Sequence, residues 1–475
     1  MKKKSLGFRT KLAYGSGNLG YGAMGQTVSS FVMFYATSVL GLPGAVVGVI
    51  IAITSLWDGL SDPIIGYLSD RTRSKIFGRR LGHMLFASFA LAINNVLLWS
   101  CPAFSQKWAS SLWLLIFLLT QETFNTFFAT PYAALCIDIA PDYSDQTNIQ
   151  GFKTVFSIFG MILPSLLMSV FMPGGNAQFD RHGYVNIALV NGVIVIVCGL
   201  IATFGTIRRV HAMPNYYVGI EKEKKEKHGL KKILQGYAET FKKKDFRVVM
   251  LGYSVCLIAM MFLSSVGMHL FTFCYGFSGL QISALMICLF GGAIISQPIW
   301  VSVVKKYDKK QTLIFALCVI LFGLGFVSIT FLFRLYCSSN LIFWFVVPSL
   351  LFSGLGAGAL YSLPHSMYAD VVTMEQFKTG ENNAGRYTGY YTFTYNFSNS
   401  IALLFIGVLL QTIGFNSNES VQTLEVQAGL GKLVFLGSAI AITIAILIFS
   451  EYSLKRSDVL KVQIKANEGL EDKNT

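Results

Sequence analysis

The sequence carries little charge for its length. Only 13% of its 475 residues are Asp, Glu, Lys or Arg, whereas 53% are hydrophobic, and the mean hydropathy is +0.56. A soluble domain typically carries about 25% charged residues, so the composition excludes a water-soluble globular protein. In place of charge the chain has a series of long apolar runs, which indicates a protein that crosses a membrane several times.

Cysteine and histidine give no sign of a metal or redox site. The eight cysteines lie mostly inside apolar runs, without a CxxC pair or a Cys/His cluster. We therefore expect no disulfide framework, no metal centre and no cofactor. The start of the chain, Met1-Lys2-Lys3-Lys4, is followed by mixed polar sequence without a small-residue cleavage site, so we expect no signal peptide.

Twelve apolar runs are long enough to cross a bilayer as helices. The predicted spans are 12–38, 44–68, 81–101, 110–136, 151–173, 185–207, 247–275, 279–304, 311–334, 341–369, 386–414 and 430–451. The sequence thus predicts an all-α polytopic membrane protein, with twelve transmembrane helices in two six-helix bundles.

The net charge of +14 reflects membrane orientation rather than a nucleic-acid partner. If both termini are cytoplasmic, only four of the 38 basic residues fall in outer loops: Lys107, Arg181, Arg334 and Lys432. Lys and Arg concentrate in the cytoplasmic loops of membrane proteins. We therefore expect an integral protein of the plasma (cell inner) membrane with both termini in the cytoplasm.

The longest loop separates six spans from six. Residues 1–207 are predicted to form an N-terminal bundle that holds a cation site, and 247–451 a C-terminal bundle, with 452–475 as a cytoplasmic tail. The linker 208–246 contains an amphipathic pattern, in which apolar residues share one helical face opposite lysines: Leu230, Ile233, Leu234, Tyr237 and Phe241. This pattern predicts a helix that lies on the inner leaflet.

The two halves repeat weakly. Leu60-Ser61-Asp62-Pro63-Ile64 in span 2 is echoed by Ile295-Ser296-Gln297-Pro298-Ile299 in span 8, and the segment 131–138 by 364–370. Parallel repeats of six spans are typical of transporters whose two bundles rock around a central site. A duplicated frame without transport would show the same echoes. Because only the first copy keeps the acid, we expect an ion site in the N-terminal half.

Span 2 places two carboxylates inside an apolar run. Asp58 and Asp62 are four residues apart, which puts them on one helical face, one turn from each other. A charge in hydrocarbon costs several kcal/mol, so such acids are usually buried against protein and functional. Ser61 adds an oxygen, and hard oxygen ligands suit Na⁺ or a proton. The alternative is a helix end whose acids meet loop arginines.

The same stretch carries a family resemblance. The loop from Gly66-Tyr67-Leu68-Ser69-Asp70-Arg71 to Gly78-Arg79-Arg80 looks like the signature loop of the major facilitator superfamily. Trp57-Asp58-Gly59-Leu60-Ser61-Asp62-Pro63 resembles the glycoside–pentoside–hexuronide:cation symporter family, whose best-known member carries melibiose. Weaker matches are Tyr14-Gly15-Ser16-Gly17, Thr130-Pro131-Tyr132 and Ala369-Asp370-Val371-Val372. The resemblance implies the twelve-span fold and symport of a solute with Na⁺ or H⁺.

Position by position, the resemblance implies cation ligands at Asp58, Ser61, Asp62 and Thr126. The family's sugar-anchoring residues are less well kept, because the acids of spans 1 and 4 correspond here to Gly22 and Ala129. The basic residue that opens span 5 is present as Lys153, whereas the lysine of span 11 is replaced by Asn396. The coupling residues therefore resemble the family more closely than the substrate pocket does.

Glu122 and Asn125 are further candidates in span 4. Glu122 precedes Thr126 by one helical turn, so this pair could bind substrate or extend the cation site. A glutamate at this place also resembles the lysolipid-carrying relatives of the family. The alternative is a protonated carboxylic acid that is hydrogen-bonded between helices.

His365 and Tyr391 are substrate candidates in spans 10 and 11. His365 could donate to a substrate hydroxyl, although a lone membrane histidine more often joins helices. Tyr391 belongs to a stripe of tyrosines that ends at Asn396 and suits a neutral ring, although tyrosines also form interface belts. His365 and Asp370 spell HxxxxD, a spacing found in some membrane acyltransferases. Because five helical residues place the two poorly in register, we do not expect an enzyme.

The charged loop after span 2 is a candidate gate. Asp70, Arg71, Arg79 and Arg80 could pair with the facing bundle or with helix ends when the inner side is shut, and separate when it opens.

Together these patterns predict a cation-coupled transporter of a small solute, most simply a sugar or glycoside. Two alternatives remain open. One is a carrier of amphipathic lipid-like or aglycone substrates on the same fold, and the other is a membrane sensor or scaffold that transports nothing.

Overall fold

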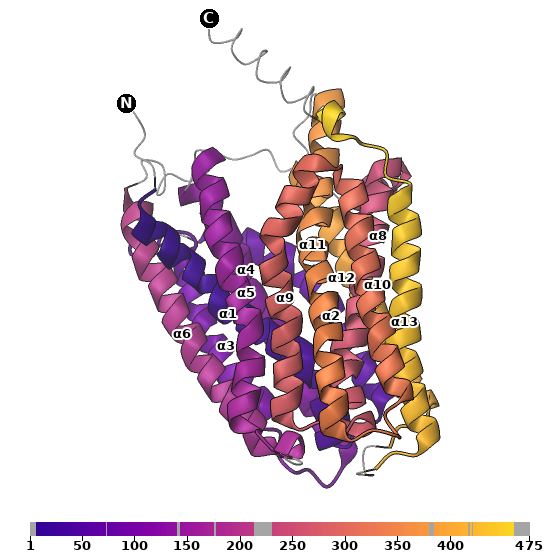
Figure 1. The fold of residues 1–475 in the computed structure, drawn as a ribbon. Helices are drawn as coiled ribbons and strands as arrows, with labels where there is room; N and C mark the ends of the chain where they lie inside the picture. Colours follow the sequence, from indigo (N-terminus) through magenta and orange to yellow (C-terminus); the bar gives the residue numbers. More distant parts are fainter. Residues whose placement is uncertain are drawn as a thin grey trace, which may run out of the picture. The chain divides into compact units, whose positions relative to one another are not determined.

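The computed structural model describes residues 6–72, 74–139, 143–174, 177–212, 230–379, 384–416, 419 and 421–459. Within these ranges the chain is helical (Figure 1): α1 (Phe8–Phe34), α2 (Gly44–Arg71), α3 (Leu81–Trp99), α4 (Lys107–Ile139), α5 (Tyr143–Phe171), α6 (Arg181–His211), α7 (Leu230–Lys242), α8 (Lys244–His269), α9 (Gly279–Lys306), α10 (Lys309–Leu332), α11 (Ser339–Thr379), α12 (Ala384–Thr412) and α13 (Leu424–Ser450). Two π-helical turns, η1 (Tyr35–Val39) and η3 (Leu270–Cys274), follow α1 and α8, and a 3-10 turn, η2 (Ala177–Phe179), precedes α6.

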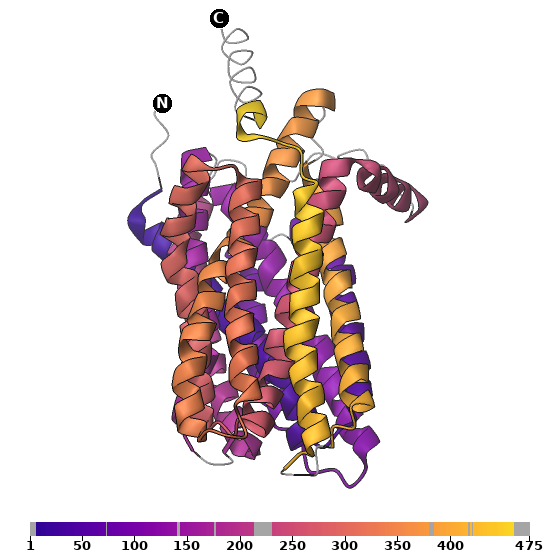
Figure 2. The same ribbon diagram turned by 45° about the vertical axis from the view of Figure 1, so that its right-hand side comes forward.

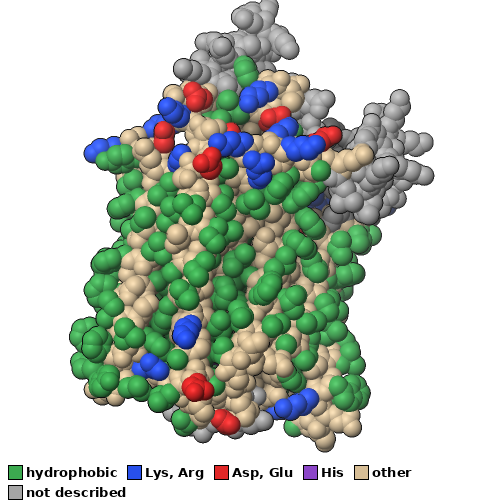
Figure 3. Space-filling view, turned by 90° about the vertical axis from the view of Figure 1, so that its right-hand side faces the viewer, with side chains coloured by type: hydrophobic (Ala, Val, Ile, Leu, Met, Phe, Trp, Pro, Cys, Tyr) green, Lys and Arg blue, Asp and Glu red, His purple; other side chains and the backbone are tan. Residues whose placement is uncertain are grey.

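The helices have the length and composition of membrane spans. Among the described residues, eleven are long and apolar enough to cross a bilayer. Helix α1 is less apolar, because glycine and hydroxyl residues are spread along it, but its 27 residues match the others in length. It completes the predicted set of twelve spans. The predicted all-α architecture is confirmed, and Figure 3 shows an apolar face with most charged side chains towards one end.

Several helices extend past the apolar runs that predict them. Helix α11 contains Pro348 and Pro364 and continues to Thr379, whereas the apolar run ends near residue 369. Hydropathy marks only the part of a helix that lies in hydrocarbon, while backbone hydrogen bonding continues into the polar region beyond it. The polar ends of α4 and α11 carry the ion pairs described below.

Contacts between Cα atoms divide the chain into two compact units. Unit 1 comprises Met1–Lys224, Ser264–Ile287 and Leu403–Gln427, and unit 2 comprises Lys225–Leu263, Cys288–Ala402 and Ala428–Thr475. Two segments of the second half of the sequence therefore group with the first half. Because this grouping follows contacts rather than chain order, the division into bundles 1–207 and 247–451 stays a prediction.

In unit 1, helix α1 packs closely against α5 and α6. A Cβ atom built on Gly160 of α5 would lie 2.4 Å from the backbone oxygen of Leu19, and one built on Gly22 would lie 3.0 Å from that of Ser157. Glycine at both positions therefore lets the two helix backbones touch. This close contact sets which face of α1 packs against α5.

A buried hydrogen bond joins two π-helical turns of unit 1. Thr37 in η1 and His269, which immediately precedes η3, are 2.7 Å apart between Oγ1 and Nε2. Phe34 and Phe415 pack edge-on against the imidazole, with ring centroids 5.1 and 5.2 Å away. Both side chains of the hydrogen bond are buried. His269 thus joins helices, which was the simpler expectation for a histidine inside a membrane span.

Unit 2 contains the linker helix α7, which lies crosswise to the long helices (Figure 2). The Tyr237 hydroxyl is 3.0 Å from Thr394 Oγ1 of α12, and the Tyr237 ring meets Tyr390 edge-on at 5.5 Å. Lys243 then donates to Glu375 of α11. The predicted amphipathic helix is therefore present, and its second half packs against α12. The side chains of residues 230–234 lie outside the described part.

Candidate functional site

The predicted cation ligands lie on α2 and α4, which pack against each other within unit 1. Asp58, Ser61 and Asp62 come from the middle of α2, and Thr126 comes from α4. Residue pairs 65 to 68 positions apart meet along this contact, so the two helices run in the same direction. Acids one turn apart on α2 consequently face hydroxyls one turn apart on α4.

The four side chains form one cluster of oxygen atoms. Thr126 Oγ1 lies 3.3 Å from Asp58 Oδ1 and 3.0 Å from Ser61 Oγ, and both hydroxyl residues are buried. The Ser61 hydroxyl also donates to the backbone oxygen of Asp58 at 3.0 Å. Carboxylate and hydroxyl oxygens of this kind are ligands for a hard monovalent cation or acceptors for a proton.

Thr130 is a member of the cluster that sequence reasoning missed. Its hydroxyl donates to Asp62 Oδ1 at 3.3 Å, as Thr126 does to Asp58. The sequence held a signal for it, because Thr126 and Thr130 repeat the four-residue spacing of Asp58 and Asp62. Two parallel helices with matched spacing place each threonine opposite one acid.

Glu122 and Asn125 lie one turn before this cluster on α4. The Asn125 amide donates to Glu122 Oε2 at 3.1 Å, and the Glu122 backbone oxygen is 3.1 Å from Thr126 Oγ1. Asn125 Oδ1 is buried, and no hydrogen-bond donor reaches it from the described residues. A buried acceptor without a partner is costly, so this oxygen is suited to a donor or cation from a ligand.

The oxygen cluster does not have the composition of a transition-metal site. Among the described residues, no group of three His, Cys, Asp or Glu side chains could hold a metal ion. The cluster instead combines two carboxylates with threonine and serine hydroxyls, which are hard ligands of the kind that alkali cations take.

Lys153, the predicted basic anchor, lies on α5 of the same unit. Its Nζ atom is 5.3 Å from the ring centroid of Tyr132, and its backbone oxygen accepts from Asn18 at 3.3 Å. Within the described residues it forms no ion pair with Asp58 or Asp62. Lys153 is therefore not an ion-pair partner of either acid in the described structure.

The predicted substrate residues of the second half lie in unit 2, in an aromatic cluster. Tyr391 of α12 is buried, stacks on Tyr368 at 4.4 Å and lies 5.6 Å from the ring of Tyr253. The exposed His365 of α11 meets the Tyr253 ring edge-on at 5.0 Å. Asn396 follows on α12, where its backbone oxygen accepts from Ser400.

Tyr253 and Tyr368 were missed by the sequence analysis. They come from α8 and α11, and no motif links them to Tyr391. The Tyr391 hydroxyl is buried, and no described residue hydrogen-bonds to it. Because Tyr391 is 4% exposed and its ring stacks on Tyr368, its role in binding a neutral ring stays a prediction.

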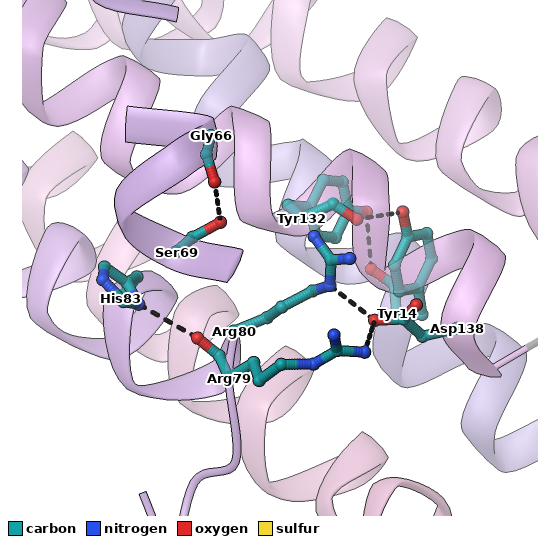
Figure 4. Close-up of polar contacts among 8 residues, drawn as sticks. All are labelled: Tyr14, Gly66, Ser69, Arg79, Arg80, His83, Tyr132 and Asp138. Carbon is teal, nitrogen blue, oxygen red and sulfur yellow. Dashed lines mark hydrogen bonds and ion pairs between the residues drawn. The ribbon is translucent and has the colours of Figure 1, made fainter. Parts of the chain in front are cut away.

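The arginines of the α2–α3 loop pair with α4 of the same unit (Figure 4). Arg80 Nε donates to Asp138 Oδ2 at 2.5 Å, and Arg79 lies 4.0 Å from the same carboxylate. The tight loop between Ser74 and Gly78 brings them there, with Gly78 at a φ of 62° that favours glycine. Asp138, which the gate prediction did not include, is thus their partner.

The other two residues of the predicted gate cannot be placed in the same way. Asp70 and Arg71 form the end of α2, and their side chains lie outside the described part of the chain. Their role as gate residues stays a prediction.

Unit 2 contains a counterpart of the Arg80–Asp138 pair. Lys309, at the start of α10, donates to Asp370 Oδ2 at 2.5 Å and to the backbone oxygen of Ser366 at 3.3 Å. Asp370 is the residue that the sequence repeat pairs with Asp138. In both units, therefore, an ion pair joins the polar end of a long helix to the start of a neighbouring one.

The fold is that of known transporters. The solved structure of the nucleoside transporter NupG superposes with a TM-score of 0.61, covering 94% of this chain and 100% of that chain at 12% identity. At this identity the likeness shows a shared fold, that of a helical membrane protein.

The sequence comparisons name the family. The model of the family described as MFS/sugar transport protein matches residues 13–456, and the chain belongs to this family. An uncharacterized symporter of Synechocystis sp. is 23% identical over 495 residues, with 87% of each chain covered. The sodium-dependent lysophosphatidylcholine symporter 1 of Xenopus tropicalis is 22% identical over 489 residues, covering 95% of this chain and 88% of the relative.

Proposed function

We propose that this transporter couples the entry of Na⁺ or H⁺ to the uptake of a small solute by alternating access. The observation that carries the proposal is the oxygen cluster of Asp58, Ser61, Asp62 and Thr126 between α2 and α4. The name of the relative from Xenopus tropicalis, a sodium-dependent symporter, supports coupling to a cation. Solute and ion each favour the same occluded state, so each raises the affinity for the other.

Electrostatics explains why the site takes a cation. Two carboxylates one helical turn apart, about 6 Å, repel by roughly 3 kcal/mol at an effective dielectric constant of about 20. A positive charge close to both acids offsets that repulsion. A bound Na⁺ or a shared proton supplies it. Na⁺ and H⁺ therefore compete for one site, and Na⁺ binds less tightly at lower pH.

The test is concentrative uptake into vesicles under an imposed Na⁺ or pH gradient. Asp58→Asn and Asp62→Asn each remove one charge from the site while keeping the side-chain shape. We expect both variants to lose accumulation against a gradient and to keep some downhill exchange, because the solute pathway is unchanged. Glu425→Gln, in the first turn of α13, is the control for loss of a carboxylate elsewhere. If both Asn variants still accumulate substrate, the coupling site is not here.

For the solute, we propose a sugar or glycoside held without the acidic anchors of melibiose carriers. Glycine at position 22 packs so closely on Ser157 that a longer side chain would meet the α5 backbone, and Ala129 carries no polar group. A galactoside loses charge-assisted hydrogen bonds of about 1.5–3 kcal/mol each at such a site. We expect melibiose to be a poor substrate in the vesicle assay, and tight, transported binding of it would contradict this pocket.

An amphipathic substrate is the second candidate. The Glu122–Asn125 pair favours it, because one partly buried polar pair with a free acceptor suits a single head group, whereas a sugar needs many partners. Uptake of radiolabelled lysophosphatidylcholine and of a panel of glycosides by the same vesicles separates the two, with Glu122→Gln expected to impair only the amphipathic substrate. A chain that transports nothing in either panel under any gradient would be a sensor or scaffold.

For orientation, we propose cytoplasmic termini in the plasma membrane. Val421, between α12 and α13, is 76% exposed and lies in a loop expected outside. A single cysteine at this position, on a background without the eight native cysteines, should react with an impermeant maleimide on intact cells. A cysteine at Lys75, in the α2–α3 loop, should react only after permeabilisation. The reverse pattern would overturn the orientation.

A further inference from the structure

A cavity of about 420 Å³ opens in unit 2 where α9, α11 and the segment after α13 meet. Its walls are largely apolar and include Trp300, Val304, Leu363, Leu454 and Val459. Lys305 and Lys309 line the same cavity, as does Arg456. A pocket with an apolar interior and basic residues around it has the character of a site for an amphiphile that carries negative charge.

The basic residues of the cavity differ in how their charge is balanced. Lys309 is neutralised by Asp370 at 2.5 Å. Arg456 is held in place by donating from its guanidinium to the backbone oxygen of Lys305 at 2.8 Å. In the described part of the chain, neither Lys305 nor the Arg456 guanidinium has a carboxylate within ion-pair distance. The lining thus carries three basic residues and one acid, Asp370, which pairs with Lys309.

The position of the cavity matches the boundary of the bilayer. Lys305 lies at the end of span α9, and Arg456 follows the end of span α13 at Ser450. Trp300 also lines a second, almost entirely apolar groove of about 430 Å³ with Phe315, Phe322 and Phe352. A head group at Lys305 and Arg456 would therefore have apolar surface on the hydrocarbon side.

We propose that this cavity binds an anionic glycerophospholipid from the leaflet at this end of the helices. The phosphate lies between Lys305 and Arg456. The part of the acyl chain next to the head group lies against Trp300 and Val304. The occupant is a lipid rather than a soluble phosphate ester because most of the lining is apolar. Basic pockets between transmembrane helices are recognised by anionic lipids for the same reason. This site is separate from the oxygen cluster of unit 1 and does not depend on the transported solute.

Native mass spectrometry of the full chain in neutral detergent tests the proposal. Phosphatidylglycerol and phosphatidylcholine of equal chain length are titrated, and the first bound lipid is quantified. Lys305→Gln combined with Arg456→Gln should weaken phosphatidylglycerol binding roughly thirtyfold, since each basic residue near the head group contributes to affinity. Val304→Trp fills the cavity without changing charge and should also weaken binding.

The matched control removes two neighbouring charges that do not line the cavity, Lys306→Gln with Lys455→Gln. It should weaken binding less than about threefold, through screened long-range attraction only. Equal loss in the two double variants would overturn the site in favour of general surface charge. So would equal binding of phosphatidylcholine. Displacement of the lipid by glycerol phosphate at the same concentration would show a site for soluble phosphate esters instead.

Discussion

Helices α2 and α4 of unit 1 and helices α9 and α11 of unit 2 come from matching places in the two repeats, yet they bury different chemistry. Ser61 and Ser296 are alike, because each hydroxyl donates to the backbone oxygen three residues earlier at 3.0 Å. The next residue differs. Asp62 accepts a hydrogen bond from Thr130, whereas Gln297 donates to the backbone oxygen of Gly358 at 2.8 Å.

This difference shows how one copy of a repeat retains a cation site while the other does not. The Gln297 amide satisfies a backbone acceptor and adds no charge, so this contact between α9 and α11 needs no cation. A Cβ built on Gly358 would lie 2.1 Å from Ser296 Oγ, so this helix contact has no room for a threonine like those of α4. The acids of α2, in contrast, need a proton or a cation to be buried at low cost.

The strongest test of the comparison exchanges the two residue types. Asp62→Gln should abolish concentrative uptake, because the amide cannot balance a cation, and should leave stability unchanged or improved. Gln297→Glu should keep ion-dependent uptake, but it places a carboxylate against the Gly358 carbonyl and should lower the free energy of unfolding by about 1–3 kcal/mol. Uptake under a Na⁺ gradient and chemical denaturation in detergent measure the two effects. Loss of coupling in Gln297→Glu would break the comparison.

The ion pairs at the polar helix ends should contribute similar stability in the two units. Asp138→Asn separates α4 from Arg80, and Asp370→Asn separates α11 from Lys309. The paired side chains are 11–24% exposed, so each loss should cost about 2 kcal/mol of stability, between the values for surface and buried pairs. Thermal unfolding of the two variants checks this. A large loss of stability in one variant with none in the other would show that only one of the two ion pairs stabilises its helix contact.

The smallest predicted effect concerns the hydroxyls of α4. Thr126→Val and Thr130→Val each remove one donor to an acid, worth about 1 kcal/mol, and should raise the Na⁺ concentration for half-maximal uptake roughly fivefold to tenfold. Thr123→Val is the control, because its hydroxyl accepts from Trp57 and contacts neither acid. A similar shift for Thr123→Val would mean that packing of α4, and not the oxygen cluster, sets the cation affinity.

The sequence predicted the features that are set locally. Long apolar runs predict spans because a helix is the simplest structure that satisfies its own backbone in hydrocarbon. The spacing of Asp58 and Asp62 predicts one helical face for the same geometric reason. Hydropathy predicted the end of the apolar run near residue 369 but not the end of α11 at Thr379, since a helix can continue past the hydrocarbon.

Contacts that depend on how separate helices pack could not be predicted from the sequence. Tyr253 and Tyr368 meet Tyr391 because three separate helices bring them together. Arg80 was expected to pair with the facing bundle or with a helix end, and the sequence could not say which helix end; in the structure it is that of α4, at Asp138. Thr130 is the intermediate case, because its spacing was visible but its relation to Asp62 required the direction of α2 and α4.

The reciprocal tyrosine pair of unit 1 has a mechanical consequence. The Tyr14 hydroxyl donates to the backbone oxygen of Tyr132, the Tyr132 hydroxyl donates to that of Tyr14, both at 2.7 Å, and the rings stack at 4.3 Å (Figure 4). Two crossed attachments resist sliding of α1 along α4, because either direction of travel stretches both bonds. The pair therefore holds α1 and α4 in one register at this level, because a shift of one helix along the other would require both bonds to break.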